Sequence, residues 1–474
     1  MTEQLEGLPI LDIAGMHELE KRSITVNAPS FNLMLRAGRT IGEAAVKMYP
    51  KAEFLILAGP GNNGGDGFIA AQFLLEKGKE VALFSTSLRE IYKGDALKAL
   101  ETCHAPLVSL DTLQKKLADG NLVLIDALFG IGLARPLTGE YETLVEEINQ
   151  SGHPIIAIDI PSGIQADNGS VMGIAVKAKH TITFAAPKPG HILYPGRSFC
   201  GDLQIADIGL GPVASPFQVN AKQKLPFSKT YHKYQKGYCL VLGSADMPGA
   251  AMLAAKAARR VGCGIVAVAA PESTKNLQLA YQPGLIFKST ANANEFKDHI
   301  QDSRIDALIL GCGLDEYYRT YLDKALEKRI PLVVDGGAIQ EGQPFLNDNV
   351  IMTPHEGEFA RAFPTITSES KLERALSAAK QRNAIIVLKG PDTIIAAPDG
   401  QARININGGP ELATAGSGDI LAGIIGGLLS QKLSPFEAAS FGVWLHGAAG
   451  ASFGQGLIAE DLPNLLSSLL KEIS

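Results

Sequence analysis

The residues Gly416, Ser417, Gly418 and Asp419 have the types and spacing to hold a phosphate group at the start of a helix. Two glycines allow the backbone to turn tightly and to bring its N–H groups against an anion. The apolar run 420–429 that follows predicts a helix whose positive end faces that anion. Asp419 then has two interpretations that these residues leave open: it caps the helix, or it is a catalytic base beside a nucleotide phosphate.

A second glycine-rich segment, 59–67, has the sequence GPGNNGGDG and follows the apolar run 54–58. Because the helical pattern 68–76 comes next, the segment has the strand, turn and helix order of a dinucleotide-binding site. The acidic residue that should bind the ribose about 20 positions later is missing, since the second strand ends in the Ser-Thr-Ser run 85–87. The amides and the carboxylate of the segment supply oxygen ligands, which suit a phosphate beside a hard cation. An ordinary Asx-rich turn is the alternative.

Polar residues also follow two further apolar runs of the same half. Asp126 follows the run 122–125, and Asp159 follows the run 155–158. In a parallel sheet with helical crossovers the carboxyl ends of the strands lie along one edge, where such folds bind ligands. Each aspartate alone is typical of a turn, but together with Asn63 they are expected to converge on one site.

The second half contains two further candidate segments. His355 lies at a strand end in the sequence IMTPHEGE; a lone histidine is usually structural, but this position also fits a ligand contact. Lys389 follows the predicted strand 385–388 and opens the turn KGPDT, which can hold a phosphate or a ribose. The helix expected at 436–451 contains His446 and is interpreted as packing.

The length of 474 residues exceeds the size at which a single hydrophobic core stops growing, so two domains are expected. Strand and helix patterns alternate on both sides of the proline-containing segment 209–229, where we place the boundary. The fold class is therefore α/β, with two three-layer units that occupy residues 1–218 and 226–474, the first of them Rossmann-like.

Composition narrows the classes of partner. The formal net charge is −6 and no basic stripe is present, so nucleic acid is not an expected partner. The five cysteines are scattered and never form a CxxC pair, which predicts free thiols in a reducing cytoplasm and neither a disulfide framework nor a zinc site. No basic region followed by an apolar one opens the sequence, and no apolar run approaches the roughly 20 residues of a membrane span. We therefore expect a cytoplasmic protein without a membrane partner.

Taken together, the motifs carry a resemblance that extends over essentially the whole chain. The first half, with GPGNNGGDG, DALFGIGLARP, IDIPSG, FAAPKPG and GDLQIADIGL, resembles NAD(P)H-hydrate epimerase. The second half, with GSADMPGAA, LGCGL, TPHEGEFAR, LKGPDTIIAAPDG and NGGPELATAGSGDILAGI, is similar to the ribokinase-like ADP-dependent NAD(P)H-hydrate dehydratase. In this order the halves resemble the bifunctional NAD(P)H-hydrate repair enzymes. That resemblance implies epimerisation of the R and S hydrates of NADH and NADPH (NADHX and NADPHX), and dehydration of the S form while ADP becomes AMP and phosphate.

For the first domain, the resemblance implies that the asparagine-rich loop holds the phosphates of the substrate. Asp159 is then the acid/base group near the nicotinamide ring. A potassium ion is expected between the loop and two strand ends, with Asn63, Asp126 and Ser162 as ligands. The implied substrate contacts are Asn62, Asn63, Gly64, Gly65, Asp66, Gly130, Ile131, Gly132, Leu133, Ala134, Arg135, Pro136, Tyr141 and Asp159.

For the ribokinase-like second domain, the resemblance implies that Asp419 takes the proton of the substrate hydroxyl. The glycine turn and the helix start stabilise the phosphoryl group during its transfer from ADP, with Mg²⁺ as the accompanying metal. Phosphorylation makes the hydroxyl a good leaving group, and elimination restores the nicotinamide double bond. The implied hydrate contacts are Ala250, Gly313, His355 and Asp419. The implied nucleotide contacts are Lys389, Gly390, Pro391, Asp392, Thr393 and Gly418.

Several points stay open at the level of sequence. Many relatives of the second domain carry another acidic residue shortly after the strand aspartate, where this chain has Asp335, Gly336 and Gly337. The choice between ADP and ATP and the chemical route of epimerisation are also open. A kinase of a small alcohol fused to an inactive Rossmann-like partner is one alternative, and a ligand-sensing or interaction role of the first half is another. The expected partners are small molecules and further copies of the chain in a homo-oligomer.

Overall fold

The computed structural model describes residues 2–26, 29–118, 120–224, 232–313, 318–342 and 347–473. The chain forms two compact units: Leu8–Ser215 is the first, and Thr2–Gly7 together with Pro216–Ser474 is the second. The predicted ranges 1–218 and 226–474 differ from these units at both ends of the first unit. The part of the expected boundary segment at 225–231 lies outside the described residues.

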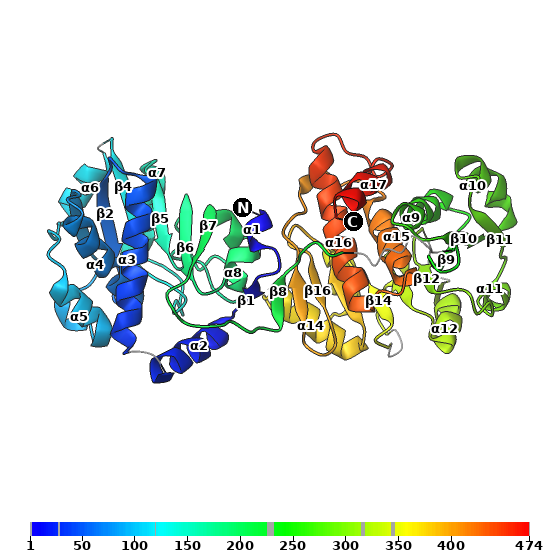
Figure 1. The fold of residues 1–474 in the computed structure, drawn as a ribbon, viewed down its shortest axis with the longest axis horizontal. Coiled ribbons are helices and arrows are strands. Elements are labelled where there is room, and N and C mark those ends of the chain that lie inside the picture. Colours follow the sequence, from blue (N-terminus) through cyan, green and yellow to red (C-terminus); the bar gives the residue numbers. More distant parts are fainter. Residues whose placement is uncertain are drawn as a thin grey trace. The chain divides into compact units, whose positions relative to one another are not determined.

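The first unit contains a sheet in which all strands are parallel (Figure 1). Its strand order is β3 (Val81–Ser85), β2 (Glu53–Ala58), β4 (Leu122–Ala127), β5 (Ile155–Ile158), β6 (His180–Phe184) and β7 (Asp202–Ala206). The apolar run of β2 is buried on both faces, since Ile56 packs in one core and Leu57 in another. The unit is therefore the predicted three-layer, Rossmann-like α/β fold.

Helices cover the two faces of this sheet with separate cores. One core contains residues of α3 (Ser30–Met48), α4 (Asn62–Glu76) and α5 (Gly94–Thr102). The other contains residues of α6 (Leu110–Leu117) and α7 (Glu140–Gln150). Because β2 has β3 on one side and β4 on the other, the connections that leave β2 and β4 diverge, and the crevice between them is where such folds bind ligands.

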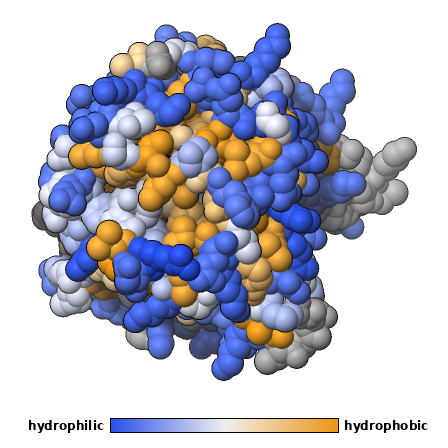
Figure 2. Space-filling model, turned by 90° about the vertical axis from the view of Figure 1, so that its left-hand side faces the viewer, coloured by the Kyte–Doolittle hydropathy of each residue, from blue (hydrophilic) through white to orange (hydrophobic). Residues whose placement is uncertain are grey.

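At one face of the first unit, apolar residues gather among hydrophilic ones, as Figure 2 shows. The large exposed apolar side chains of the first unit include Leu88, Ile91, Leu107 and Leu110. Within the described residues, no helix is both long and apolar enough to cross a membrane. All five cysteines are free, and four of them are buried, as predicted.

The second unit contains a mixed sheet (Figure 1). Its strand order is β8 (Phe217–Val219), β17 (Ala402–Ile404), β16 (Ile394–Ala396), β15 (Ile385–Leu388), β14 (Val350–Met352), β13 (Leu332–Val334), β12 (Ala307–Leu310), β9 (Tyr238–Leu242), β10 (Ile265–Ala270) and β11 (Ile286–Ser289). The strands from β15 to β11 are parallel, whereas β16 is antiparallel to both of its neighbours.

Helices of the second unit share a core with this sheet. They are α9 (Pro248–Arg260), α15 (Ser417–Ser430), α16 (Pro435–Phe453) and α17 (Leu462–Glu472). Glycines allow α15 to lie very close to α9, because a Cβ atom at Gly423 would stand 2.2 Å from the carbonyl oxygen of Ala254. The remaining helices of the unit include α10 (Lys275–Tyr281), α11 (Ala293–His299), α12 (Arg319–Lys328), α13 (Glu356–Ala362) and α14 (Lys371–Arg382).

The N-terminal segment belongs to the second unit, which the sequence analysis did not predict. It contains α1 (Thr2–Leu5) and is held by side-chain and backbone contacts. Trp444 Nε1 donates a hydrogen bond of 2.8 Å to Glu6 Oε1, and the N–H of Gly7 donates one of 3.0 Å to the carbonyl of Val219. The first unit is thus inserted into the chain of the second.

Candidate active sites

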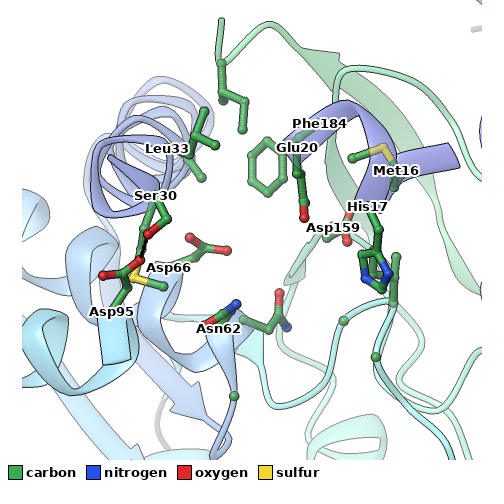
Figure 3. Close-up of a pocket in the computed structure, with 18 of the residues that line it drawn as sticks. Met16, His17, Glu20, Ser30, Leu33, Asn62, Asp66, Asp95, Asp159 and Phe184 are labelled. Atoms are coloured by element: carbon green, nitrogen blue, oxygen red, sulfur yellow. Dashed lines mark hydrogen bonds between the residues drawn. The ribbon is translucent and has the colours of Figure 1, made fainter. Parts of the chain in front are cut away.

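A cavity of about 520 Å³ opens in the first unit at the carboxyl ends of its strands (Figure 3). Helix α2 (Ile13–Val26), the starts of α3 and α4, the end of β6, and the segments after β4, β5 and β7 surround it. Apolar side chains such as Leu33 and Phe184 line one part of it, and carboxyl groups line another. The sequence-predicted residues that line the cavity are Asn62, Asn63, Asp66, Gly130, Ile131, Gly132, Leu133 and Asp159.

The asparagine-rich segment is the beginning of a helix rather than a loop. Helix α4 starts at Asn62, six residues before the predicted start at residue 68. Close packing explains the glycines, because a Cβ atom at Gly64 would lie 2.0 Å from the carbonyl oxygen of Gly59, and one at Gly67 would lie 2.6 Å from Ala127 Cβ. The N-terminus of a helix therefore faces the cavity, where its free N–H groups can bind a phosphate.

Asp159 follows β5 directly and has a left-handed backbone with φ of 63°. A non-glycine residue in this region is uncommon and is held there by its surroundings. The carboxylate Oδ1 accepts hydrogen bonds of 2.7 Å from Lys188 Nζ and 2.8 Å from Thr183 Oγ1. The backbone carbonyl of Asp159 lies 2.7 Å from His191 Nε2. These contacts fix the direction of the carboxylate.

The charge of this cluster is set by a buried ammonium group. Burial raises the pKa of Asp159, but Lys188 opposes this effect, and the net pKa is lowered below the usual aspartate value. Burial, and then the neighbouring Lys188, lowers the pKa of His191 to about 4. Because His191 Nδ1 accepts a 2.9 Å hydrogen bond from the N–H of Lys188, its Nε2 carries the proton and donates to Asp159. At neutral pH the cluster holds an ionised Asp159 and a neutral His191.

Besides Asp95, which pairs with Lys98, two other carboxyl groups face the same cavity. Asp66 of α4 and Glu20 of α2 both point into it, as does Asp159 (Figure 3). Burial, then the charges of Asp159 and Glu20, raises the pKa of Asp66 well above its usual range. Burial also raises the pKa of Glu20. The pKa values of Asp66 and Glu20 are therefore raised, whereas that of Asp159 is lowered.

The predicted cation ligands Asp126 and Ser162 are in contact. Ser162 donates to Asp126 from its hydroxyl at 2.6 Å and from its N–H at 2.8 Å. The carbonyl of Phe129 lies 3.1 Å from the same hydroxyl. Asn63 lies beside Gly130, where a Cβ atom would be 3.2 Å from Asn63 Oδ1, and Asn63 Nδ2 is buried without a hydrogen-bond partner among the described residues. Burial raises the pKa of Asp126 to about 6.

Some implied substrate contacts of the first unit do not line the cavity. Tyr141 instead donates a 3.2 Å hydrogen bond to Thr86 Oγ1 and packs edge-on against Phe129, with ring centroids 4.9 Å apart. Other residues of this group lie within α4 or further along the segment after β4. They are Gly64, Gly65, Ala134, Arg135 and Pro136.

In the second unit, the GSGD segment forms the start of α15. Gly416 is the N-cap with φ of 87°, and the helix begins at Ser417. Asp419 lies in the first turn, so the interpretation of Asp419 as the helix cap is wrong. The reason is that glycine adopts the left-handed cap conformation without strain, which moves the helix start toward the N-terminus. Ser417 Oγ lies 3.0 Å from Nε2 of the buried His446.

Charged side chains from separate strand ends meet at this helix start. Lys389 Nζ donates a 3.0 Å hydrogen bond to Asp335 Oδ1 and lies 3.7 Å from Glu358 Oε2. Thr353 Oγ1 donates to the same Asp335 oxygen at 2.6 Å. A Cβ atom at Gly418 would lie 3.3 Å from Lys389 Nζ, which places the ammonium against the start of α15.

Asp419 lies close to Asp335 and Cys312. One ligand atom from each of the three side chains lies within 4.8 Å of the other two. Burial, then the charge of Asp335, raises the pKa of Asp419 to about 6, although its hydrogen bond with Cys312 and the nearby Lys389 act in the opposite direction. Burial raises the pKa of Cys312 well above its usual range. A carboxyl group with a pKa of about 6 can serve as a base near neutral pH.

The structure places the other predicted residues of the second unit as follows. His355 caps α13: its Nδ1 accepts from the N–H groups of Gly357 at 3.0 Å and Glu358 at 3.3 Å. Gly313 lies beside Ala250, since a Cβ atom at Gly313 would be 2.9 Å from Ala250 Cβ.

The turn after β15 is held by its own contacts. Thr393 Oγ1 accepts a 3.1 Å hydrogen bond from the N–H of Gly390. The carboxylate of Asp392 is engaged in a 2.6 Å ion pair with Lys371.

Sequence reasoning missed several residues of both clusters. Their signals were weak: a lysine in a proline-rich turn, a threonine within a strand, and polar residues among apolar ones. The missed residues are Glu20, Thr183, Lys188, His191, Cys312, Thr353 and Glu358, while Asp335 was named without a role and His446 was interpreted as packing.

Comparison with known proteins gives the same division of the chain. Residues 30–190 match the family model "YjeF-related protein N-terminus", and residues 238–472 match "NAD(P)H-hydrate dehydratase". The curated protein "Bifunctional NAD(P)H-hydrate repair enzyme Nnr" of Coxiella burnetii is 33% identical over 94% of this chain and 96% of its own length. The protein of the same name from Moorella thermoacetica is 34% identical over 98% and 97%, respectively.

Two of the similar solved structures each cover about half of the chain or less. The ADP/ATP-dependent NAD(P)H-hydrate dehydratase from Bacillus subtilis, co-crystallised with ATP and Mg²⁺, is 30% identical, with a TM-score of 0.48 over 53% of this chain and 95% of that protein. The yeast protein YNL200c is 25% identical, with a TM-score of 0.35 over 39% of this chain and 83% of that protein.

Proposed function

The chain belongs to the family of bifunctional NAD(P)H-hydrate repair enzymes, and from this membership we propose how its two units divide the work. The first unit epimerises the R and S hydrates of NADH and NADPH. The second unit dehydrates the S hydrate to NADH or NADPH and converts ADP to AMP and phosphate. The single observation that carries the assignment of residues is that each unit has a carboxylate suited to act as a base. Asp159 lies at the cavity of the first unit, and Asp419 lies in the first turn of α15 in the second.

In the first unit, the N-terminus of α4 with Asn62 would bind the phosphates of the hydrate, and the cavity would hold the hydrated ring. The apolar residues Leu33 and Phe184 would exclude water from the ring. Asp159 would act as the base, because Lys188 keeps its carboxylate ionised and Thr183 holds its direction. Such a fixed, charged oxygen needs no reorganisation when a proton is transferred.

A potassium ion fits the cluster that Asp126 and Ser162 form. Asp126, Ser162 and the carbonyl of Phe129 offer oxygen atoms close together, and hard cations prefer oxygen ligands. The unpartnered amide nitrogen of Asn63 supports this assignment, because a half-turn of the amide presents its oxygen instead. When bound, the ion would supply positive charge for the phosphates of the substrate.

In the second unit, Asp419 would take the proton of the substrate hydroxyl as the oxygen attacks the terminal phosphorus of ADP. The N–H groups at the start of α15 and the ammonium of Lys389 would stabilise the charge on the transferring phosphoryl group. The C6–O bond of the phosphate ester then breaks, phosphate leaves with the electron pair of that bond, the neighbouring carbon C5 loses a proton, and the C5–C6 double bond is restored. Asp335 would hold the Mg²⁺ that accompanies the nucleotide phosphates, because its carboxylate lies next to Asp419 and leaves Asp419 to act as the base.

The remaining site residues are assigned by the same proposal. Ala250 and Gly313, which lie together, would contact the hydrate, as would His355. The segment 389–393 and Gly418 would hold the nucleotide. The expected location is the cytoplasm, supported by the free cysteines, and the homo-oligomer stays a prediction.

Product analysis with the S hydrate alone tests the second unit. We expect NADH, AMP and phosphate in equal amounts when ADP is supplied, and a parallel reaction with ATP in place of ADP identifies the better donor. A phosphorylated compound that accumulates without NADH would instead support a kinase of small alcohols.

A further inference from the structure

Four carboxyl groups line the cavity of the first unit, those of Glu20, Asp66, Asp95 and Asp159, and only Asp159 has a fully buried cation beside it. Lys188 is fully buried, and its Nζ donates to Asp159, to Thr183 at 2.7 Å and to the carbonyl of Phe184 at 3.2 Å. Within the described part of the chain, Asp66 forms no ion pair. The positive charge of the cluster is therefore committed to Asp159.

The carboxyl of Asp66 lies on the opposite side of the cavity from Asp159. Asp66 belongs to the first turns of α4. Asp159 after β5 and Glu20 of α2 both lie on the other side of the cavity (Figure 3). His17 of α2 also lines the cavity, on the side of Glu20. A ligand in the cavity thus has a carboxyl group on each side.

Mutual repulsion distributes protons among these groups. Negative charges on Asp159 and Glu20 disfavour a further negative charge on Asp66, and burial acts in the same direction. Asp66 therefore keeps its proton at a pH at which Asp159 has lost its own. Two carboxyl groups whose surroundings favour opposite protonation states form an acid and a base.

We propose that Asp66 is a catalytic acid of the epimerisation and works opposite the base Asp159. The proposal rests on the function proposed above for the first unit and adds the second proton-transferring group to it. It also selects a chemical route, because an acid and a base on opposite sides of a ring suit a reaction that opens the ring.

The step follows from the chemistry of the hydrated ring, in which C6 carries the hydroxyl and is bonded to N1. Asp159 takes the hydroxyl proton, the C6–O bond becomes an aldehyde double bond, and the C6–N1 bond breaks. The electron pair of that bond stays on N1, which receives the proton of Asp66. The aldehyde rotates about C5–C6. N1 then attacks its other face, returns its proton to Asp66, and the new alkoxide takes the proton from Asp159.

The test uses the full-length chain, pure R hydrate and no nucleotide, so that the S hydrate accumulates. We expect Asp66→Asn to lower kcat about 100-fold or more and to change KM less than threefold, since the amide keeps the shape but cannot give up a proton. A kcat within threefold of the unchanged protein would overturn the proposal. So would a Glu20→Gln variant that loses more activity than Asp66→Asn, because Glu20 would then be the acid.

Asp95→Asn is the matched control. Asp95 also lies at this cavity, but its carboxylate already accepts a hydrogen bond from Ser30 and pairs with Lys98 at 2.9 Å. We expect its kcat to change less than threefold. Asp66→Glu, which retains an acid one methylene further out, should keep at least tenfold more activity than Asp66→Asn, and equal loss in both would contradict an acid role.

Epimerisation in H₂¹⁸O tests the step without any variant. Ring opening predicts that the S hydrate keeps the oxygen of the R hydrate, whereas one solvent oxygen per epimerisation would show loss and return of water and overturn the step. If the unchanged protein does not accelerate epimerisation at all, the function proposed for the first unit fails. If it does and Asp66→Asn is fully active, only the role of Asp66 fails.

Discussion

Lys188 Nζ lies 2.7 Å from Asp159 Oδ1, and the lysine side chain has no exposed surface. The two residues are 29 positions apart in the sequence and come from the ends of neighbouring strands β5 and β6. A buried ammonium needs a partner, and here the partner is the carboxylate at the cavity. The pair therefore sets the protonation state of the proposed base.

Removal of this ammonium should change the pH dependence of epimerisation. In Lys188→Met the pKa of Asp159 is expected to rise, because burial then acts without the opposing charge. The acid limb of the kcat profile should move to higher pH, and the rate at neutral pH should fall about tenfold or more. Steady-state rates between pH 4 and 9 with R hydrate measure this shift.

The same pair links acid stability to Asp159. Its pKa is lower in the folded protein than in the unfolded chain, so its contribution to stability is present above about pH 4 and is lost as the pH falls through the folded-state value. For the pH profile of epimerisation, the contradicting result is an acid limb that stays at the same pH in Lys188→Met while the variant dehydrates the S hydrate at the normal rate.

Asp419 should control the pH dependence of the other activity. Because its pKa is raised to about 6 and a base must be ionised, the dehydration rate is expected to increase with pH through about 6 and then level off. Asp419→Asn should lower this rate at least about 100-fold and leave epimerisation within twofold. Rates of NADH formation from the S hydrate with ADP provide the measurement. A variant that dehydrates normally would exclude Asp419 as the base.

The charge of Asp335 is expected to tune that base. Since Asp335 raises the pKa of Asp419, its replacement in Asp335→Asn should move the midpoint of the dehydration profile to lower pH. The variant also replaces the charged acceptor of the hydrogen bond from Lys389 Nζ, so Lys389 should be less well positioned and KM for ADP should rise. A midpoint that moves upward would show that the loss of order around Lys389 outweighs the electrostatic effect.

The N-terminal segment should stabilise the second unit. Trp444 is the only tryptophan, and its indole N–H donates to Glu6, so its fluorescence reports on this contact. Glu6→Ala should lower the free energy of unfolding of the second unit by about 1–2 kcal/mol. Denaturant unfolding followed by tryptophan fluorescence measures it. Glu43→Ala, at an exposed position of α3, is the control, and equal effects of the two variants would contradict this assignment.

Potassium should affect the first activity through Asn63. If Asn63, Asp126 and Ser162 hold the ion, replacement of K⁺ by tetramethylammonium should slow epimerisation about tenfold, and Asn63→Ala should abolish the response to K⁺. Titration of the R-to-S rate with KCl at constant ionic strength measures both. An unchanged response in Asn63→Ala would place the ion elsewhere.

The sequence predicted the elements that carry the sites because apolar strands and glycine-rich segments leave strong local patterns. Asp126, Asp159 and Asp419 all lie at the expected strand ends or helix start. The start of α4 was misplaced, since a helix that contains NNGGDG contradicts helix propensity. Only the close approach of neighbouring backbone explains why glycine is needed there.

Long-range contacts were beyond local patterns. Lys188 reaches Asp159 from the segment FAAPKPG, in which nothing local indicates a partner for the lysine, and Glu20 reaches the cavity from a helix with no motif of its own. His446 was interpreted as packing, and only the fold brings it to Ser417. The insertion of the first unit after residue 7 could not be predicted either, because the short N-terminal segment has no pattern that distinguishes its partner.

The central claim is that two activities in one chain repair both epimers. The most direct measurement is the absorbance of reduced nicotinamide after the protein is added to an equal mixture of R and S hydrates with ADP. We predict that all of the hydrate becomes NADH, and that Asp159→Asn stops near half, when the S form is consumed, apart from slow spontaneous epimerisation. Recovery that stops near half with the unchanged protein would contradict an active epimerase, and no recovery would contradict the dehydratase as well.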